Sequence, residues 1–379
     1  MISYRLGDEH EELRQTVAQF AREVVAPVIG GFYERGEFPY EIIARMGKLG
    51  LFGLPFPEEY GGMGGDFFAL CLALHELGRV DSSVAITLEA AVALGAMPIY
   101  RFGNEEQRAR WLPNLCRGER LAAFGLTEPG GGSDIPGGMR TTARLEEADG
   151  TAEWVIDGSK AFITNAGTSI TSVVTALAIT GGSAERREIS SIMVPSGTPG
   201  FTVGPEYSKV GWCASDTREL AFASCRVPEA NLLGERGRGY AQFLQTLDEG
   251  RIAIAALSAG LAEGCVDECV RYAGERTAFG HHLGYFQSIQ FTIADMEARA
   301  HGARIAWYDA AARLLAGEPV KKHAAIAKLT ASNAAMDNAR DAKVLEIGEG
   351  TSEVQRMIIA RQLGLTGKNP EGGERDSSR

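Results

Sequence analysis

The spacing of apolar residues changes twice along the 379-residue chain. In the first third, apolar side chains recur three or four positions apart, which is typical of amphipathic helices. One clear example begins soon after the N-terminus and comprises Leu13, Val17, Phe20, Ala21 and Val24. We therefore expect residues 1–120 to form a helical domain.

Short β-prone runs replace the helical spacing between residues 121 and 233. They lie at 154–156, 172–179, 189–194, 201–203 and 219–222. The glycine-containing clusters at 157–159 and 181–183 are typical of turns between strands. Because strands do not alternate with helical stretches here, we expect a central antiparallel sheet or barrel and not a Rossmann fold.

Helical, alanine-rich sequence returns from residue 234 to about residue 365. The longest stretches cover 242–275, 287–316 and 321–336, and alanine has the highest intrinsic helix propensity. Residues 366–379 form a polar tail. The predicted fold class is thus a multidomain α+β protein, with a helical domain, a β domain and a second helical domain in that order.

Composition narrows the classes of partner. The net charge is −11, and such a surface repels nucleic acids and anionic membranes. The start, MISYRLGDEHEELRQ, resembles neither a signal nor a transit peptide, and apolar runs stay shorter than the roughly 20 residues of a spanning helix. We expect a cytoplasmic protein with no nucleic-acid or membrane partner. The six cysteines form no C-x-x-C pair, and we expect free thiols and no metal site.

Two segments contain glycines and hydroxyl side chains next to acidic residues: LTEPGGGSD at 126–134 and EGTSE at 349–353. Glycines let a backbone approach a flat or phosphorylated ligand closely, but a flexible interdomain turn explains the first segment equally well. In the second, Glu349 lies between an apolar stretch and a helix expected near Ser352, so a solvated turn with Ser352 and Gln355 as a capping box is the simpler explanation.

A series of segments, taken in order, resembles the acyl-CoA dehydrogenase family from about Asp8 to Leu365. These segments are YGG at 60–62, GNEEQ with WLP at 103–113, LTEPGGGSD at 126–134, DGSKAFITN at 157–165, LDEGR at 247–251, RTAFG at 276–280, FQ at 286–287, ADM at 294–296, RDAK at 340–343 and EGTSE at 349–353. Each is weak alone, but their shared order makes chance similarity implausible.

The resemblance implies an N-terminal helical domain, a central β domain and a C-terminal four-helix bundle, assembled as a homotetramer or homodimer. FAD would lie between the β domain and the bundle, partly contacted by a neighbouring subunit. Its expected contacts are Leu126, Thr127, Gly132, Ser133, Phe162, Ile163, Thr164, Arg276, Phe279, Gln287, Thr351 and Glu353. The expected acyl-CoA contacts are Ser133, Asp248, Arg251 and Gly350.

The resemblance also implies a reaction. Glu349 would remove the α-proton of an acyl-CoA while the β-hydride passes to flavin N5, giving the trans-2-enoyl-CoA, with an electron-transferring flavoprotein as acceptor and a role in fatty acid metabolism. Some relatives carry the base at the position of Gly250, and the adjacent Glu249 would point about 100° away from that direction. Two alternatives stay open: a substrate bound to a carrier protein, or an inactive acyl-CoA-binding homologue.

Two departures from the family pattern matter. Gly348 precedes the base where many relatives have tyrosine, which is compatible with a branched or bulky acyl group. Relatives also carry a Q-x-x-G-G-x-G loop, which cradles the FAD pyrophosphate, before the segment that matches RDAK. Here only three residues separate Met336 from Arg340. Either the chain lacks this loop, or the sequence omits residues there. We expect the second, with an interrupted backbone near Asn338–Ala339.

Overall fold

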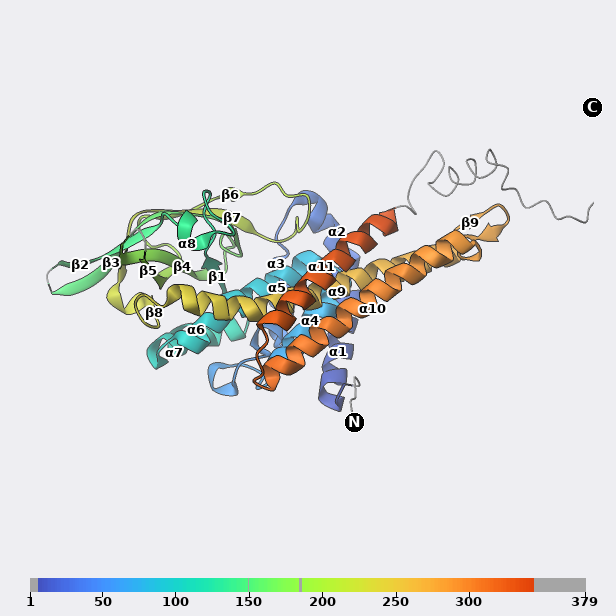
Figure 1. Ribbon diagram of the computed structural model, residues 1–379, viewed down its shortest axis with the longest axis horizontal. Helices are drawn as coiled ribbons and strands as arrows, with labels where there is room; N and C mark the ends of the chain where they lie inside the picture. The colour runs from blue at the N-terminus through green and yellow to red at the C-terminus, as the bar shows by residue number, and fades with distance from the viewer. Residues whose placement is uncertain (1–5, 149, 184–185, 344–379) are drawn as a thin grey trace, which may run out of the picture.

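The computed structural model describes residues 6–148, 150–183 and 186–343, and these form a helical layer, a β domain and a set of long helices (Figure 1). The N-terminal helices are α1 (Asp8–Phe20), α2 (Ala26–Arg35), α3 (Tyr40–Lys48), α4 (Phe67–Gly78), α5 (Ser82–Glu89), α6 (Met97–Phe102) and α7 (Glu105–Cys116). Short π-helical segments at Ala21–Val25 and Ala90–Ala96 join α1 to α2 and α5 to α6. The expected helical region is confirmed.

Local capping sets where several of these helices begin. Asp66 and Asp81 accept hydrogen bonds from the backbone N–H groups of Ala69 and Val84, each at 2.8 Å. Asn104 forms a reciprocal capping box with Gln107 at the start of α7. Such caps satisfy N–H groups that have no partner within the helix.

The central domain is a largely antiparallel eight-stranded sheet. Its strands are β1 (Leu121–Gly125), β2 (Thr142–Ala148), β3 (Thr151–Thr164), β4 (Thr171–Gly182), β5 (Arg187–Pro195), β6 (Phe201–Glu206), β7 (Thr217–Pro228) and β8 (Leu232–Leu233), with the short helix α8 (Ile135–Gly138) between β1 and β2. The order is β6-β7-β3-β2-β4-β5-β8, and β1 joins β4 in parallel.

One predicted turn is wrong. Residues 157–159 lie inside β3, where the pairing with β7 shifts register between Ile156 and Gly158. Gly158 has φ 147°, and a Cβ there would lie 2.6 Å from the Cα of Thr141. The glycine therefore marks a β-bulge beside a close backbone contact and does not end the strand.

Three long helices follow: α9 (Gly239–Glu275), α10 (Gln287–Leu315) and α11 (Lys321–Lys343). The strands β9 (Thr277–Ala278) and β10 (His281–His282) form a small hairpin between α9 and α10, at the end farthest from the sheet (Figure 1). Because α11 runs unbroken through Met336, Arg340 and Asp341, the predicted interruption of the backbone is wrong. The fourth helix of the expected bundle falls beyond residue 343, outside the described residues.

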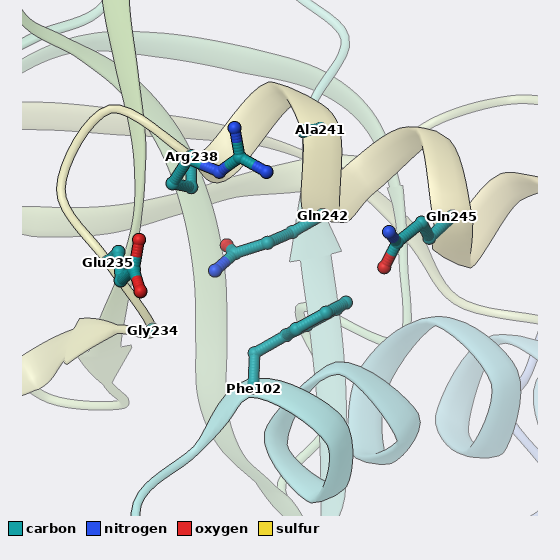
Figure 2. A pocket seen from close by; sticks show the side chains of 7 residues that line it. All are labelled: Phe102, Gly234, Glu235, Arg238, Ala241, Gln242 and Gln245. Atoms are coloured by element: carbon teal, nitrogen blue, oxygen red, sulfur yellow. The ribbon is translucent and has the colours of Figure 1, made fainter.

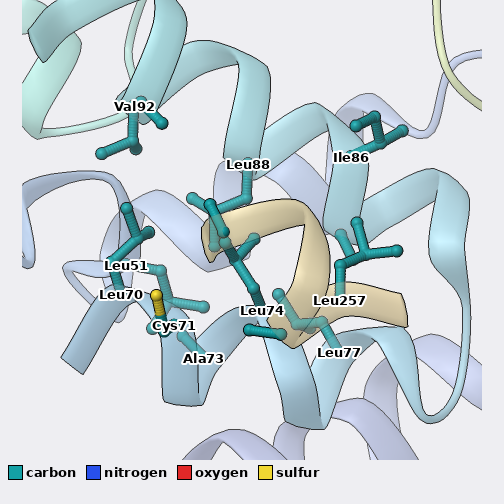
Figure 3. Close-up of a cluster of buried hydrophobic side chains, with 14 of the residues drawn as sticks. Leu51, Leu70, Cys71, Ala73, Leu74, Leu77, Ile86, Leu88, Val92 and Leu257 are labelled. Carbon is teal, nitrogen blue, oxygen red and sulfur yellow. The ribbon is translucent and has the colours of Figure 1, made fainter. Parts of the chain in front are cut away.

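The core of the helical part surrounds α4, which contacts α1, α5, α9 and α10. Leu70, Leu74 and Leu77 of α4 pack with Leu88 of α5 and Leu257 of α9 (Figure 3). The stretch Ser82–Phe102 has 21 residues, and its most apolar 18-residue window has a mean hydropathy of 1.6, enough by length and composition to cross a membrane. This differs from the expectation for apolar runs. In its most apolar window 89% is buried inside the protein, so here it is a core segment.

Glycines allow the backbones of α4 and α9 to touch. A Cβ on Gly260 would lie 2.0 Å from the carbonyl oxygen of His75, and one on Gly264 would lie 2.1 Å from that of Arg79. From the other side, a Cβ on Gly78 would lie 2.6 Å from the carbonyl oxygen of Leu257. Real Cβ atoms do not approach backbone oxygens this closely, so only glycine permits this spacing.

We predict that Gly260→Ala lowers the free energy of unfolding by about 3 kcal/mol, because the added methyl group forces the two helices apart. Gly302→Ala in α10 is the matched control. A Cβ there meets nothing within 4 Å, and alanine favours a helix by about 0.5–1 kcal/mol. Urea unfolding of both variants checks this, and equal stability of the two variants would contradict the contact.

Candidate active site

The loop after β1 is fastened to β3 by backbone contacts. The Ala161 N–H donates to the carbonyl oxygen of Thr127 at 2.8 Å, and Lys160 Nζ donates to that of Leu126 at 3.3 Å. These bonds bring Leu126 and Thr127 beside the end of β3. Two segments that are far apart in sequence, and that were both predicted to contact the cofactor, therefore lie together.

A buried ion pair holds this loop in place. Lys160 Nζ lies 2.7 Å from Glu128 Oε1, and the exposed fractions of the two side chains are 0% and 5%. Glu128 also accepts hydrogen bonds from the backbone N–H groups of Arg140 and Thr141, at 2.6 Å and 3.1 Å. Such full pairing is what a buried carboxylate requires.

The pKa shifts of this pair have opposing causes. Burial raises the pKa of Glu128, but the Lys160 ammonium and the hydrogen bonds from Lys160, Thr141 and Arg140 outweigh it, so the net pKa is lowered. Burial lowers the pKa of Lys160, and its attraction to Glu128 only partly opposes this effect. The lowered pKa keeps Glu128 ionised at neutral pH, and its negative charge favours the protonated form of Lys160.

The end of β3 has an unusual backbone. Phe162 and Asn165 have φ values of 60° and 63°, a region that bulky residues rarely occupy and that often marks functional sites. The Phe162 ring is 65% exposed and stacks on Tyr207 at 5.0 Å between ring centroids. Thr164 is half-buried, whereas Ile163 packs into the core of the sheet, so only its backbone is free to meet a ligand.

Helix α9 passes beside this loop. Phe243 stacks on Phe124 of β1 with ring centroids 5.6 Å apart, and Leu126 and Leu247 pack around the same cluster. One residue after Leu247, Asp248 forms an ion pair with Arg251. The segment of α9 that carries Asp248 and Arg251 therefore reaches the loop after β1 at Leu247. Gly132 and Ser133 lie at the exposed tip of that loop.

Three predicted cofactor residues lie elsewhere. Arg276, Phe279 and Gln287 are at the junction between α9 and α10, at the end of the helices far from the β domain (Figure 1). Phe279 is 75% exposed and has φ 52°. A single chain therefore does not bring these residues to the loop after β1. Glu349, Gly350, Thr351 and Glu353 lie outside the described residues.

Helix α5 contributes a residue that the sequence reasoning missed. Asn165 Nδ2 donates to the carbonyl oxygen of Thr87 at 2.9 Å, which ties α5 to the end of β3. Two residues later, Glu89 is buried. A Cβ on Gly250 would lie 3.5 Å from Glu89 Oε1, so this carboxyl group faces α9 between Asp248 and Arg251. A lone acid within the apolar run ITLEAAVAL was the available signal. Tyr207 and the Glu128–Lys160 pair were missed as well.

A cavity of 310 Å³ lies between α6 and the start of α9 (Figure 2). Phe102 of α6 faces Gln242 and Gln245 of α9 across it, with Glu235 and Arg238 at its side. It contains none of the residues predicted to bind cofactor or substrate. Among the described residues, no group of three or more His, Cys, Asp or Glu side chains is arranged to hold a metal ion.

We predict that Lys160→Met lowers the free energy of unfolding by about 3–5 kcal/mol, because it leaves the Glu128 carboxylate buried without its cation. The double variant Glu128→Gln/Lys160→Met should regain part of this loss. The exposed pair Arg35–Glu37 supplies the control, since Arg35→Met should cost less than about 1 kcal/mol. Chemical denaturation measures all three, and a Lys160→Met variant as stable as the Arg35→Met variant would contradict the assigned role.

Sequence comparisons agree with this arrangement. Residues 7–119 match the profile "Acyl-CoA dehydrogenase, N-terminal domain", residues 123–225 the middle domain, and residues 237–342 and 337–364 the C-terminal domain. The C-terminal profile matches in two pieces that overlap at residues 337–342 near the end of α11, where the glycine loop expected from the family pattern is absent.

Individual relatives cover almost the whole chain. The probable acyl-CoA dehydrogenase YngJ of Bacillus subtilis is 43% identical over 96% of this chain and 100% of its own. The structure of butyryl-CoA dehydrogenase from Megasphaera elsdenii has a TM-score of 0.84 at 37% identity, covering 96% of this chain and 100% of that one. A chain from a study of the electron transferring flavoprotein of Acidaminococcus fermentans has the same TM-score and identity, covering 96% and 99%.

These matches confirm the predicted family, fold class, FAD dependence and acyl-CoA dehydrogenation. With three consecutive domain matches and near-complete coverage of its relatives, the chain belongs to the acyl-CoA dehydrogenase family of FAD-dependent oxidoreductases.

Proposed function

We propose that this enzyme dehydrogenates a short or branched acyl-CoA with Glu349 as the base that removes the α-proton. The observation that supports it most directly is the junction described above, where the loop after β1, the end of β3 and residues 248–251 of α9 come together. A thioester seated there would have a flat cofactor on one side and α9 on the other. Short-chain members among the relatives support the substrate class.

The state of Glu249 favours Glu349 over the competing position. Relatives with a base on α9 carry it where this chain has Gly250, which has no side chain to act. The neighbouring Glu249 is buried and forms an ion pair with Arg101. Burial raises the pKa of Glu249 despite the opposing effect of Arg101, so its direction and its ion pair, and not its basicity, argue against it. A shift of one residue along a helix turns the side chain by about 100°.

The residues present fit the flavin end of FAD. Phe162 offers an exposed ring, Thr127 and Thr164 offer hydroxyl groups, and the ion pair of Glu128 and Lys160 fixes the loop that would lie against the cofactor. When bound, FAD accepts the hydride that leaves the β-carbon of the acyl group. The protein's part is to hold the thioester, exclude water and accept the α-proton at the Glu349 carboxylate.

The unbroken α11 favours a second candidate. Without the glycine loop between Met336 and Arg340, the pyrophosphate of FAD loses a set of backbone donors that relatives supply. We infer that FAD is held less tightly than in those relatives. If the chain bound no FAD at all, it would be an inactive acyl-CoA-binding homologue. Measuring FAD stoichiometry after purification and after incubation with excess FAD separates the two candidates.

Exposed apolar residues favour assembly of several copies. Around the tip of α9 and α10, Val270, Phe279, Tyr285 and Phe291 are all more than half exposed, and an apolar cavity of 650 Å³ lies between these helices. Large exposed apolar patches mark interaction sites. We propose a homotetramer or homodimer in which Arg276, Phe279 and Gln287 reach the FAD of a neighbouring subunit.

We also propose an electron-transferring flavoprotein as the electron acceptor, and the cytoplasm as the location of the enzyme.

We predict that Glu349→Gln lowers turnover of butyryl-CoA by at least about a hundredfold, because glutamine keeps the shape of the side chain but cannot take the proton. Glu346→Gln, three residues earlier, removes the same charge and should keep turnover within about threefold. Turnover is followed with an artificial electron acceptor, together with acyl-CoA binding. A Glu349→Gln variant with near wild-type turnover would show that another residue is the base.

We predict that Arg276→Ala weakens FAD binding about tenfold or more, because a charge-assisted hydrogen bond to the cofactor is lost. Arg271→Ala is the control on the same helix, since Arg271 is exposed and bonded to Glu268 and Glu275. FAD titration measures the affinity, and light scattering measures the assembly. A monomer that binds FAD equally well with and without Arg276 would rule out the contact between subunits.

A further inference from the structure

Glu89 differs from the other buried acids of the described chain. Glu76, Glu128, Asp216, Glu249 and Glu263 are also buried, and each has an ion-pair partner, respectively Arg14, Lys160, Arg218, Arg101 and His75 with Arg304. Glu89 is 1% exposed, and its carboxyl group has no hydrogen bond or ion pair with any described residue. In lacking any charged partner, Glu89 differs from these five acids.

The surroundings of Glu89 keep its carboxyl group neutral at physiological pH. Burial raises the pKa of Glu89 to about 8. A protonated carboxyl group can donate one hydrogen bond and accept others. A buried group with this capacity and no partner costs free energy, and a ligand that supplies the missing partner recovers that cost.

The position of Glu89 places it where the acyl group is expected. Its Oε1 atom lies 3.5 Å from the point that a Cβ on Gly250 would occupy, and Leu94 Cδ2 lies equally close to that point. Gly250 stands between Asp248 and Arg251, the predicted acyl-CoA contacts. The helix that carries Glu89 is bonded to the end of β3 through Thr87 and Asn165. The carboxyl group thus lies among elements that surround the proposed substrate site.

We propose that Glu89 determines acyl specificity by hydrogen bonding to a polar substituent on the acyl group, such as a terminal hydroxyl group. This inference rests on the proposed function, because it assumes that the acyl group enters between α5 and α9. A purely hydrocarbon acyl group would leave the carboxyl group unpaired. A hydroxylated acyl group of the same size satisfies it, and Leu94 supplies the apolar side of the same space.

The test uses the FAD-loaded enzyme and two matched pairs of CoA thioesters. They are 4-hydroxybutanoyl against pentanoyl, and 5-hydroxypentanoyl against hexanoyl. Within each pair a terminal hydroxyl group replaces a methyl group, so the ratio of kcat/KM reports on that group alone. The same ratio is taken from dissociation constants by calorimetry, which does not require turnover.

For Glu89→Leu we expect the hydroxyl-to-methyl ratio to fall about tenfold or more in at least one pair, because the hydrogen-bonding group is replaced by an apolar one of similar size. Glu89→Gln can still hydrogen bond and should keep the ratio within about threefold. Leu94→Ala is the matched control, since it removes an apolar contact from the same space and keeps the hydrogen-bonding group, so the ratio should not fall. If Glu89→Leu does not fold, Glu89→Ala takes its place.

A Glu89→Leu ratio within about twofold of wild type in both pairs, by kinetics and by binding, would overturn the proposal. So would a Glu89→Gln variant that binds all four thioesters normally but loses turnover of all four, because Glu89 would then act in proton transfer. If the wild-type enzyme bound the hydroxylated thioesters selectively but turned over none of the four, the result would support the proposed role of Glu89 and contradict the proposed dehydrogenation.

Discussion

The backbone contact between α4 and α9 is the constraint on which the rest of the structure depends. Gly260 and Gly264 of α9 and Gly78 of α4 leave no room for side chains at this contact, so the position of α9 along α4 is fixed to within a fraction of a helical turn. One end of α9 then carries Asp248 and Arg251 past the β domain. The other end carries Arg276 and the hairpin of β9 and β10 away from it. A single helix therefore links the proposed substrate site of one chain to the surface proposed to complete the site of another.

The buried acids described above are of two kinds: those that are paired and hold segments in place, and Glu89, which has no partner among the described residues. The pair of Glu128 and Lys160 is fully bonded and fastens the loop after β1 to β3. Glu249 is held by Arg101, and the proposed base, Glu349, lies on another segment. Glu89 is buried but unpaired among the described residues, and its carboxyl group faces Gly250 of α9, where the acyl group is proposed to bind. In the low-dielectric interior a paired charge stabilises one arrangement of the segments that it joins. An unpaired acid there costs free energy until a ligand supplies its hydrogen bond.

The spacing of apolar residues predicted helices and strands correctly where the conformational preference of a segment agrees with its burial in the fold. The apolar spacing and alanine content located α9, α10 and α11, and the β-prone runs located β3 to β7. The predicted turn at Gly158 was wrong, because a β-bulge and a turn both use the conformational freedom of glycine. Only the pairing of β3 with β7 distinguishes them. Lys160 and Glu89 were missed as functional residues because their environment arises from contacts between segments 32 and about 160 positions apart. The expected interruption after Met336 was inferred from the family pattern, whereas the helix is continuous because its own residues favour it.

The central claim is that this chain binds FAD and passes electrons from an acyl-CoA to it, although α11 runs unbroken from Met336 to Arg340 where relatives carry a glycine loop. The most direct measurement is the visible spectrum of the FAD-incubated protein during anaerobic addition of butyryl-CoA. The account predicts a bound flavin, close to one for each chain, whose absorbance is bleached by the thioester. A folded protein that binds the thioester but retains no flavin at saturating FAD, or a bound flavin that keeps its absorbance, would contradict it.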